Sequence, residues 1–258
     1  MAKAVNRTKN GRAKTAGFTL VEMLVVVAMT ALLLAIMLPA LSSAKEKSRR
    51  AVCQSNIRQL LTVLQSYSLD NEQFLPSCGD DKGYYHSIIL SDAVFTNLVD
   101  MAGGNSNILY CPNISFSAGT NTVPQHIPNI GYVIGYSYLA ESIAGSSKSP
   151  DYTVEPVKYP TAGTPTNELL ADANYWTPSS VSPGYFPPLM KVAPHASTGA
   201  VVNSRSTFTV GLPGNSVASV GAVGGNIGFA DGHVDWRTIT LMQTNPASSI
   251  PGDAFGTW

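Results

Sequence analysis

A run of 21 mostly apolar residues, 18–38, follows a basic N-terminal segment and most constrains what this 258-residue chain can fold into. At about 1.5 Å per residue, a helix of this length spans about 30 Å, the thickness of the hydrocarbon layer of a bilayer. Residues 1–17 carry five basic and no acidic side chains, which leaves a net charge of −5 on the remainder. Basic residues before an apolar helix are typical of the cytoplasmic side. We therefore expect one membrane-spanning helix followed by an exported part.

One acidic residue, Glu22, interrupts the apolar run. A carboxylate deep in a membrane costs about 2.5–3.5 kcal/mol and is usually functional. An ordinary secretory signal peptide has a shorter apolar core followed by a cleavage site of small residues, and this run has no convincing break of that kind. A plain signal anchor fits the length but leaves Glu22 unexplained. The acidic residue therefore requires a third interpretation.

The string GFTLVE at residues 17–22 resembles the processing site of type IV prepilins, which the pseudopilins of type II secretion share. The resemblance implies that a prepilin peptidase and methyltransferase cuts between Gly17 and Phe18, on the cytoplasmic face, and that Phe18 is then N-methylated. Glu22 becomes the fifth residue of the mature chain, where its carboxylate is expected to neutralise the N-terminal amine of a neighbouring subunit at low dielectric constant. Pro39 matches a proline that kinks or locally melts the helix in this family.

The helix is predicted to continue through residues 39–70. Residues 41–69 lack Gly and Pro. Apolar residues recur there at the i, i+3, i+4, i+7 spacing of an amphipathic helix, at Ile57, Leu60, Leu61 and Leu64. We expect one helix from Phe18 to about Ser68, apolar all round in its first half and with one apolar stripe in its second. The fold class implied is α+β, with this helix packed on a small antiparallel sheet, as in pilins.

The remaining residues, 71–258, are expected to form an extracytoplasmic head with long loops. Proline and glycine are concentrated here and charged residues are sparse. Frequent proline and glycine interrupt helices and favour short strands separated by loops. The candidate strands are residues 132–139, 168–171, 200–202 and 207–210.

A second resemblance concerns the same head. Residues 50–60, RAVCQSNIRQL, and residues 229–234, FADGHV, are similar to two stretches of a large pseudopilin-like family with an H-X9-DG element near its C-terminus. That element places a His ten positions before the Asp, where this chain has Gly221. The nearest upstream histidine, His195, is separated from Asp231 by 35 residues, so the resemblance implies a loop insertion between them.

Residues 226–237 form the clearest local pattern, two alternating runs around Asp231-Gly232. An Asp-Gly pair favours a two-residue type I′ turn. That turn predicts an apolar face for packing on the long helix, made of Ile227, Phe229, Val234 and Trp236. The opposite face is predicted to be wet and to carry Asn226, His233, Asp235 and Arg237.

The head offers one set of candidate metal ligands: Asp172, His195, Asp231, His233 and Asp235. Carboxylates and carbonyls could hold Ca²⁺, as in the C-terminal loops of the major pseudopilins that this chain resembles. A His with Asp could instead hold a transition metal. In the alternative without a metal, Asp231 is a turn residue and His233 a strand residue. No other cofactor is expected.

The three cysteines, Cys53, Cys78 and Cys111, allow three disulfide pairings in an oxidising compartment, and buried free thiols are the alternative. Cys53 and Cys111 match positions of the resembled family, which favours that pair. No motif of nucleophilic catalysis is present, although Ser137, His195 and Asp172 can be written as a triad.

The resemblance implies a non-enzymatic structural subunit of a type II secretion pseudopilus or a type IV pilus-like filament. Its partners are expected to be the prepilin peptidase, other pilin or pseudopilin subunits and an inner-membrane assembly platform. Equal numbers of basic and acidic residues, 16 each, argue against a nucleic-acid partner. We expect the chain to lie first in the bacterial inner membrane, with its N-terminus in the cytoplasm and its head outside. After assembly we expect it in a homo-oligomeric filament in the periplasm or at the cell surface. The alternative is a membrane-anchored extracytoplasmic enzyme or a metal-dependent glycan-binding module.

Overall fold

The computed structural model describes part of the chain. The described residues are 17–77, 79, 81, 85–114, 125–140, 158–159, 167–176, 191–196, 201–203, 221–246 and 255–258. The leader up to residue 16, the candidate strand at 207–210 and Cys78 lie outside them. The chain divides into two compact units, Met1–Lys45 and Glu46–Trp258.

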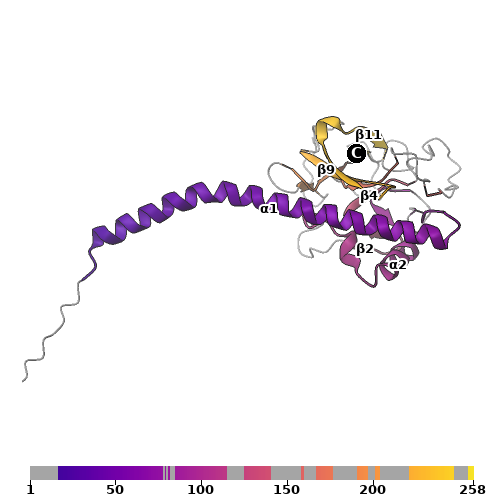
Figure 1. Ribbon diagram of the computed structural model, residues 1–258, viewed down its shortest axis with the longest axis horizontal. Helices are drawn as coiled ribbons and strands as arrows, with labels where there is room; N and C mark the ends of the chain where they lie inside the picture. Colours follow the sequence, from indigo (N-terminus) through magenta and orange to yellow (C-terminus); the bar gives the residue numbers. More distant parts are fainter. Residues whose placement is uncertain are drawn as a thin grey trace, which may run out of the picture. The chain divides into compact units, whose positions relative to one another are not determined.

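The predicted long helix is confirmed as α1, Leu20–Asp70, which is drawn in indigo and violet in Figure 1. Among the described residues, α1 is the helix long and apolar enough to cross a membrane. In the first unit its large apolar side chains from Leu20 to Leu41 are 41–80% exposed. Pro39 lies inside the helix, where it lacks the N–H that would bond to the carbonyl of Ala35.

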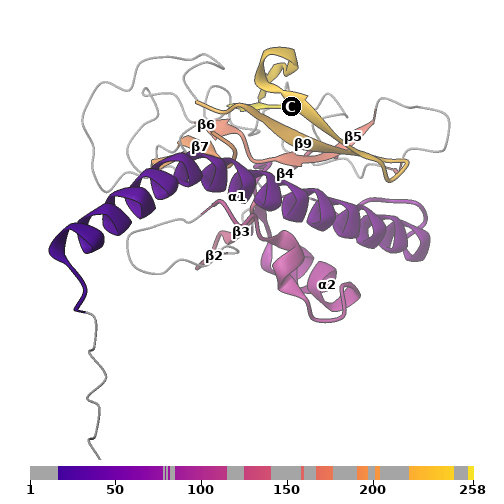
Figure 2. The same ribbon diagram turned by 60° about the vertical axis from the view of Figure 1, so that its left-hand side comes forward.

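In the second unit α1 buries one stripe of side chains. Six of them are apolar or thiol groups: Cys53, Ile57, Leu60, Leu61, Val63 and Leu64. The predicted amphipathic spacing at Ile57–Leu64 is therefore confirmed. Figure 2 shows this part of the helix with α2 and β3 on one side and β4, β5 and β9 on the other. The stripe is the centre of the head's hydrophobic core.

The short helix α2, Asp92–Met101, was not expected from the sequence. Ser91 is its N-cap, and the Ser91 hydroxyl accepts a hydrogen bond from the Val94 amide. Phe95 and Leu98 bury its inner face. A 3₁₀ turn, η1 (Ser106–Leu109), follows and leads to Cys111.

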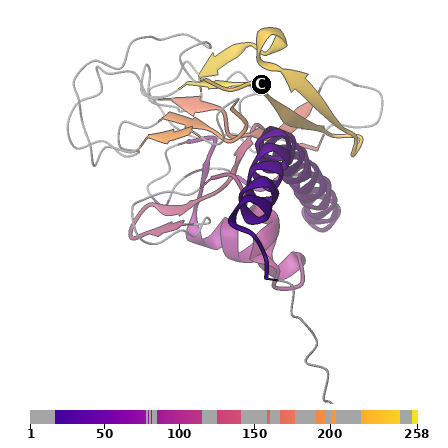
Figure 3. The same cartoon turned by 90° about the vertical axis from the view of Figure 1, so that its left-hand side faces the viewer.

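Among the described residues, three antiparallel sheets complete the head. The first, in the order β1-β3-β2, consists of Ile89–Leu90, Gly131–Val133 and Gln125–Ile127. The second, in the order β10-β9-β5-β4, consists of Val234–Thr238, Gly224–Phe229, Glu168–Asp172 and Tyr136–Tyr138. The third, in the order β11-β12-β6-β7-β8, consists of Thr244–Pro246, Phe255–Thr257, Tyr175–Trp176, Lys191–Ala193 and Val201–Asn203. A 3₁₀ turn, η3 (Ile239–Leu241), precedes β11. Figure 3 shows how the sheets are arranged around the head part of α1, and the α+β class is confirmed.

The C-terminal hairpin, β9 and β10, occupies the predicted place but has a different register. The Gly232 amide donates to the Phe229 carbonyl over 2.9 Å, and the Phe229 amide donates to the His233 carbonyl over 3.0 Å. Gly232 has a φ of +90°. The connection is thus a three-residue loop in which a tight turn is followed by a left-handed glycine, rather than the two-residue turn that Asp-Gly favours.

The extra loop residue changes which side chains share a face. Val234 pairs with Gly228, and Trp236 pairs with Asn226, so these four residues share one face. That face meets α1, because a Cβ on Gly228 would lie 2.5 Å from Cγ2 of Ile57. The predicted apolar face, which packs on the helix, is therefore right for Val234 and Trp236 and wrong for Ile227 and Phe229.

The other half of the predicted face, Ile227 and Phe229, lies on the opposite side of the hairpin. Ile227 pairs with Asp235. The rings of Phe229 and His233 stack at 4.1 Å between centroids. Asn226, predicted to be wet, is only 2% exposed.

A buried histidine, His86, gives the head an acid-sensitive element. It is 1% exposed, and its Nδ1 has no hydrogen-bond partner among the residues that the structure describes. Burial lowers the pKa of His86 from 6.5 to about 4. In the unfolded chain His86 therefore takes up a proton below pH 6.5, whereas in the folded head it does so only below about pH 4.

We expect the free energy of unfolding to fall by about 3 kcal/mol between pH 6.5 and pH 4 because of this group. In a His86→Phe variant this part of the pH dependence should disappear. Urea titrations of the full chain in detergent, at several pH values, measure it. His126→Gln is the control, because the His126 side chain is 43% exposed. An unchanged slope in His86→Phe would show that another group causes the acid sensitivity.

Candidate functional site

The start of α1 is shaped by Thr19 and Glu22. The Glu22 carboxylate accepts hydrogen bonds from the Thr19 amide over 2.8 Å and from the Thr19 hydroxyl over 2.6 Å. The Glu22 amide in turn donates to the Thr19 hydroxyl oxygen over 3.2 Å. This is a capping box, in which an N-cap threonine and the third helical residue satisfy each other's backbone amides. Glu22 therefore has a structural partner within its own chain.

The predicted cleavage site lies just outside this cap. Gly17 and Phe18 precede the helix, and Phe18 is 66% exposed. A Cβ added to Gly17 would meet no atom within 4 Å. The bond between them is thus in non-helical, open chain, as a peptidase substrate requires.

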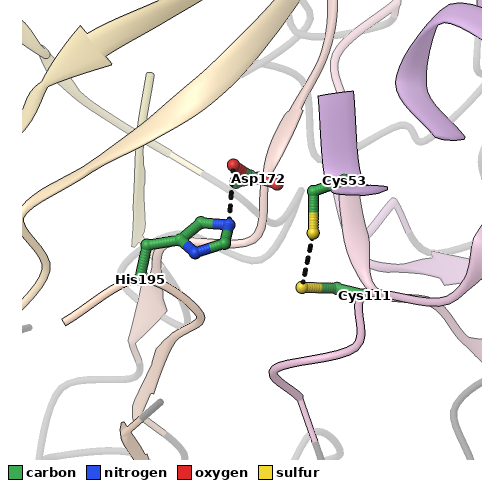
Figure 4. A group of neighbouring side chains, drawn as sticks. All are labelled: Cys53, Cys111, Asp172 and His195. Atoms are coloured by element: carbon green, nitrogen blue, oxygen red, sulfur yellow. Dashed lines mark hydrogen bonds and ion pairs between the residues drawn. The ribbon is translucent and has the colours of Figure 1, made fainter. Parts of the chain in front are cut away.

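Two of the five predicted metal ligands meet in the interior of the head. Asp172 ends β5 in one sheet, and His195 follows β7 in another. His195 Nε2 lies 3.3 Å from Oδ2 of Asp172, and both side chains are fully buried. Figure 4 shows them facing the pair Cys53 and Cys111.

The other three predicted ligands lie elsewhere, at the exposed end of the β9–β10 hairpin. His233 Nδ1 contacts Oδ1 of Asp231, and His233 Nε2 lies 3.9 Å from Oδ2 of Asp235. Their side chains are 43–76% exposed. Hydrogen bonds from the His233 backbone and ring lower the pKa of Asp231. The five residues thus do not form one cluster.

The two cysteines predicted to pair are neighbours. Cys53 Sγ on α1 and Cys111 Sγ after η1 lie 3.1 Å apart as free, buried thiols. A hydrogen bond to Cys111 and burial raise the pKa of Cys53 far above its ordinary value. The predicted disulfide remains a prediction.

Thiols, carboxylate and imidazole together form one cluster. One ligand atom from each of Cys53, Cys111, Asp172 and His195 lies within 4.8 Å of the other three. The sequence spacing gives no hint of this set, because its members are separated by 22 to 60 intervening residues. Sequence reasoning identified Asp172 and His195 as ligands but treated the cysteines separately.

The proposed catalytic triad is not assembled among the described residues. Ser137 is fully buried, and no hydrogen bond joins its hydroxyl to His195 there. Asp172 and His195 are closed to solvent as well. A substrate cannot reach these groups in this conformation.

Comparisons with known proteins agree with the geometry at the N-terminus. Residues 12–38 match the family described as the prokaryotic N-terminal methylation motif. The chain is also similar to the type IV major pilin protein PilA of Myxococcus xanthus (strain DK1622), with 27% identity over 115 residues. The match covers 41% of this chain and 52% of that pilin, so the chain spans about half the length of its relative. No solved structure matches the chain.

The motif, the relative and the long apolar helix together support a type IV pilin-like protein. Its N-terminal segment carries a methylation motif of prepilins and a helix suited to membrane anchoring. Subunits of this kind are generally structural rather than enzymatic.

Proposed function

We propose that this chain is a structural, non-enzymatic subunit of a type IV pilus-like filament or a type II secretion pseudopilus. The observation that carries the proposal is the joint occurrence of the methylation motif at residues 12–38 and a 51-residue helix whose first half is exposed and apolar. A prepilin peptidase cuts between Gly17 and Phe18, and Phe18 is then N-methylated. The helix holds the precursor in the inner membrane with its N-terminus in the cytoplasm and its head outside.

Assembly moves the apolar part of α1 from lipid into a bundle of identical helices. Lipid tails are as apolar as leucine side chains, so burial alone supplies little driving force for this transfer. The energy therefore comes from an inner-membrane assembly platform. Glu22 pairs with the Phe18 amine of a neighbouring subunit and sets the axial register, while Pro39 loosens the helix where it leaves the most apolar part.

Two forms of filament agree with this geometry. Similarity to a major pilin favours a surface pilus over a secretion pseudopilus, since that relative is described as a type IV major pilin. The alternative of a tethered enzyme has less support, because Asp172 and His195 are closed to solvent and Asp231 lies apart from them.

Processing is the first property to test. We expect the full chain, expressed with a prepilin peptidase, to lose residues 1–17 and to gain one methyl group on Phe18. Intact-mass spectrometry and N-terminal sequencing measure both changes. A Gly17→Val variant should stay uncut, and its fold should be unchanged, since a Cβ at Gly17 meets no neighbour within 4 Å. A precursor that still begins at Met1, or a cut elsewhere, would refute the assembly mechanism.

A further inference from the structure

The strongest unassigned feature of the head is the cluster of Cys53, Cys111, Asp172 and His195. Each ligand atom lies within 4.8 Å of the others, and all four residues are buried. They come from four parts of the chain: α1, the segment after η1, β5 and the segment after β7 (Figure 4). The chain brings two thiols, a carboxylate and an imidazole to one point inside its core.

Neighbouring groups orient the imidazole of His195. Its Nδ1 lies 2.7 Å from Oε1 of Glu46, a contact that places a proton on Nδ1. Asn113 Nδ2 donates to Oε2 of the same carboxylate over 2.9 Å, and Arg50 Nε donates to Oε1 over 3.0 Å. Nε2 then points to the cluster, where Oδ2 of Asp172 lies 3.3 Å away. A histidine that binds a metal through one nitrogen and donates to a carboxylate through the other has this arrangement.

Asp172 is held in the same way. The Asn226 backbone amide and side-chain amide donate to its Oδ2 over 2.6 Å and 2.9 Å. Its Oδ1 is buried and, within the described part of the chain, has no hydrogen-bond partner. An imidazole nitrogen, a carboxylate with one unpaired oxygen and two thiols thus lie together inside the core. A buried carboxylate oxygen without a partner is costly, and a cation bound among these four groups satisfies it.

We propose that Cys53, Cys111, Asp172 and His195 bind one Zn²⁺ ion as a closed, four-coordinate structural site. Zinc takes thiolate, imidazole and carboxylate ligands in tetrahedral geometry, at about 2.3 Å for sulfur and about 2.0–2.2 Å for nitrogen and oxygen. Those bonds separate neighbouring ligand atoms by about 3.3–3.8 Å. The two sulfur atoms, now 3.1 Å apart, need to separate by about 0.6 Å, and the longest ligand distance of 4.8 Å needs to shorten by about 1 Å. Side-chain rotations of this size leave the backbone in place.

The donor set selects zinc over calcium. Ca²⁺ takes six to eight oxygen ligands, whereas this cluster offers one carboxylate and two sulfurs. Binding displaces protons: each thiol loses one to become a thiolate ligand, and Nε2 of His195 must be unprotonated. Zinc affinity therefore increases with pH.

The ion would join parts of the head that are otherwise linked by packing. Cys53 is on the helix, Cys111 follows η1, Asp172 ends β5 of one sheet, and His195 follows β7 of another. A closed site of four protein ligands leaves no position for substrate. The proposed role is therefore to stabilise the head, in agreement with a structural subunit.

The test uses the full chain in detergent, purified with a reductant and given one equivalent of Zn²⁺ or Co²⁺. We expect one retained Zn²⁺ per chain by elemental mass spectrometry. With Co²⁺ we expect the visible bands of a tetrahedral ion and a thiolate-to-cobalt charge-transfer band. Cys53→Ser and His195→Asn should retain less than about a tenth of the metal. Cys78→Ser and His233→Asn should retain it fully, since neither residue belongs to the four ligands.

A measurement on the unmutated chain keeps the proposal testable where a variant does not fold. Bound Zn²⁺ should protect Cys53 and Cys111 from alkylation, and a chelator should remove the protection. A folded, reduced chain that retains no metal overturns the proposal. So does a Cys53–Cys111 disulfide, detected by mass spectrometry in the exported protein, that persists when zinc is supplied throughout expression. Metal retained by Cys53→Ser but lost in His233→Asn would move the site to the hairpin and also overturn it.

Discussion

A Glu22→Ala variant is expected to be cleaved and methylated like the unmutated chain and to be absent from filaments. This variant removes two interactions of Glu22 at once. The capping box with Thr19 loses its carboxylate, and the proposed partner of the Phe18 amine in the neighbouring subunit disappears. Sheared filament fractions, compared with the membrane fraction by immunoblotting, measure incorporation. We expect a loss of at least tenfold.

Glu22→Gln separates the two interactions. A glutamine at the third helical position still accepts the hydrogen bond from the Thr19 amide, because capping boxes use Glu or Gln. It has no charge to neutralise an amine. We expect Glu22→Gln to be as defective in assembly as Glu22→Ala. If Glu22→Gln subunits assemble normally while Glu22→Ala subunits do not, capping is the function of Glu22 and the intersubunit ion pair is refuted.

Gly228→Ala is expected to lower the free energy of unfolding by about 1–3 kcal/mol, through overpacking where β9 crosses α1. The new Cβ would lie 2.5 Å from Cγ2 of Ile57 and 3.0 Å from Cδ1 of Leu61. Both side chains are fully or almost fully buried, so neither can swing into solvent. Urea unfolding of the full chain, followed by the fluorescence of its tryptophans, measures the loss.

A double-mutant cycle identifies the cause. If the clash with Ile57 is responsible, Gly228→Ala should cost less in an Ile57→Ala background, and the two losses should not add. Gly232→Ala is the matched control: Gly232 has a φ of +90° but no atom within 4 Å of a Cβ. Its cost should reflect backbone strain alone and should be unaffected by Ile57→Ala. Additive losses at Gly228 and Ile57 would show that the helix and strand are not in tight contact there.

The long helix was predictable because its signal is local. Residues 41–69 lack helix breakers, and the apolar spacing around Ile57 repeats within the span of a few turns. The same information was present for α2, where Ser91 caps a segment with Phe95 and Leu98 on one face. That helix was missed because it is ten residues long and lies within a turn-rich head.

The hairpin shows how a single residue alters the outcome. Its existence followed from two alternating runs around Asp231-Gly232, but its register depended on whether two or three residues form the loop. Because side chains alternate along a strand, this difference changes which residues of β9 face the same way as Val234. Tertiary contacts favour the observed register, because it turns Gly228 towards α1 and so allows Ile57 to approach β9 closely.

The buried cluster was half predictable. Asp172 and His195 stood out as chemically capable residues in a head with few charges. Cys53 and Cys111 appeared to belong to a separate question, the choice of a disulfide. The four side chains come together only when α1 packs against two sheets. Their spacing in the sequence does not indicate contacts between elements that are separated by 22 to 60 residues. Glu46, which orients His195, was equally hidden in a charged stretch of the helix.

The capping box at the start of α1 also bears on how a peptidase distinguishes its target bond. Thr19 ends the helical hydrogen-bond pattern one residue after Phe18, so the peptide bond after Gly17 requires no unwinding before it enters an active site. After the proposed cut between Gly17 and Phe18, Thr19 and Glu22 both remain, and the first helical turn keeps its cap. The two side chains therefore fix how far the start of the helix lies from the proposed scissile bond. We expect Thr19→Ala to slow cleavage or to produce cuts at neighbouring bonds, with little effect on the free energy of unfolding of the head.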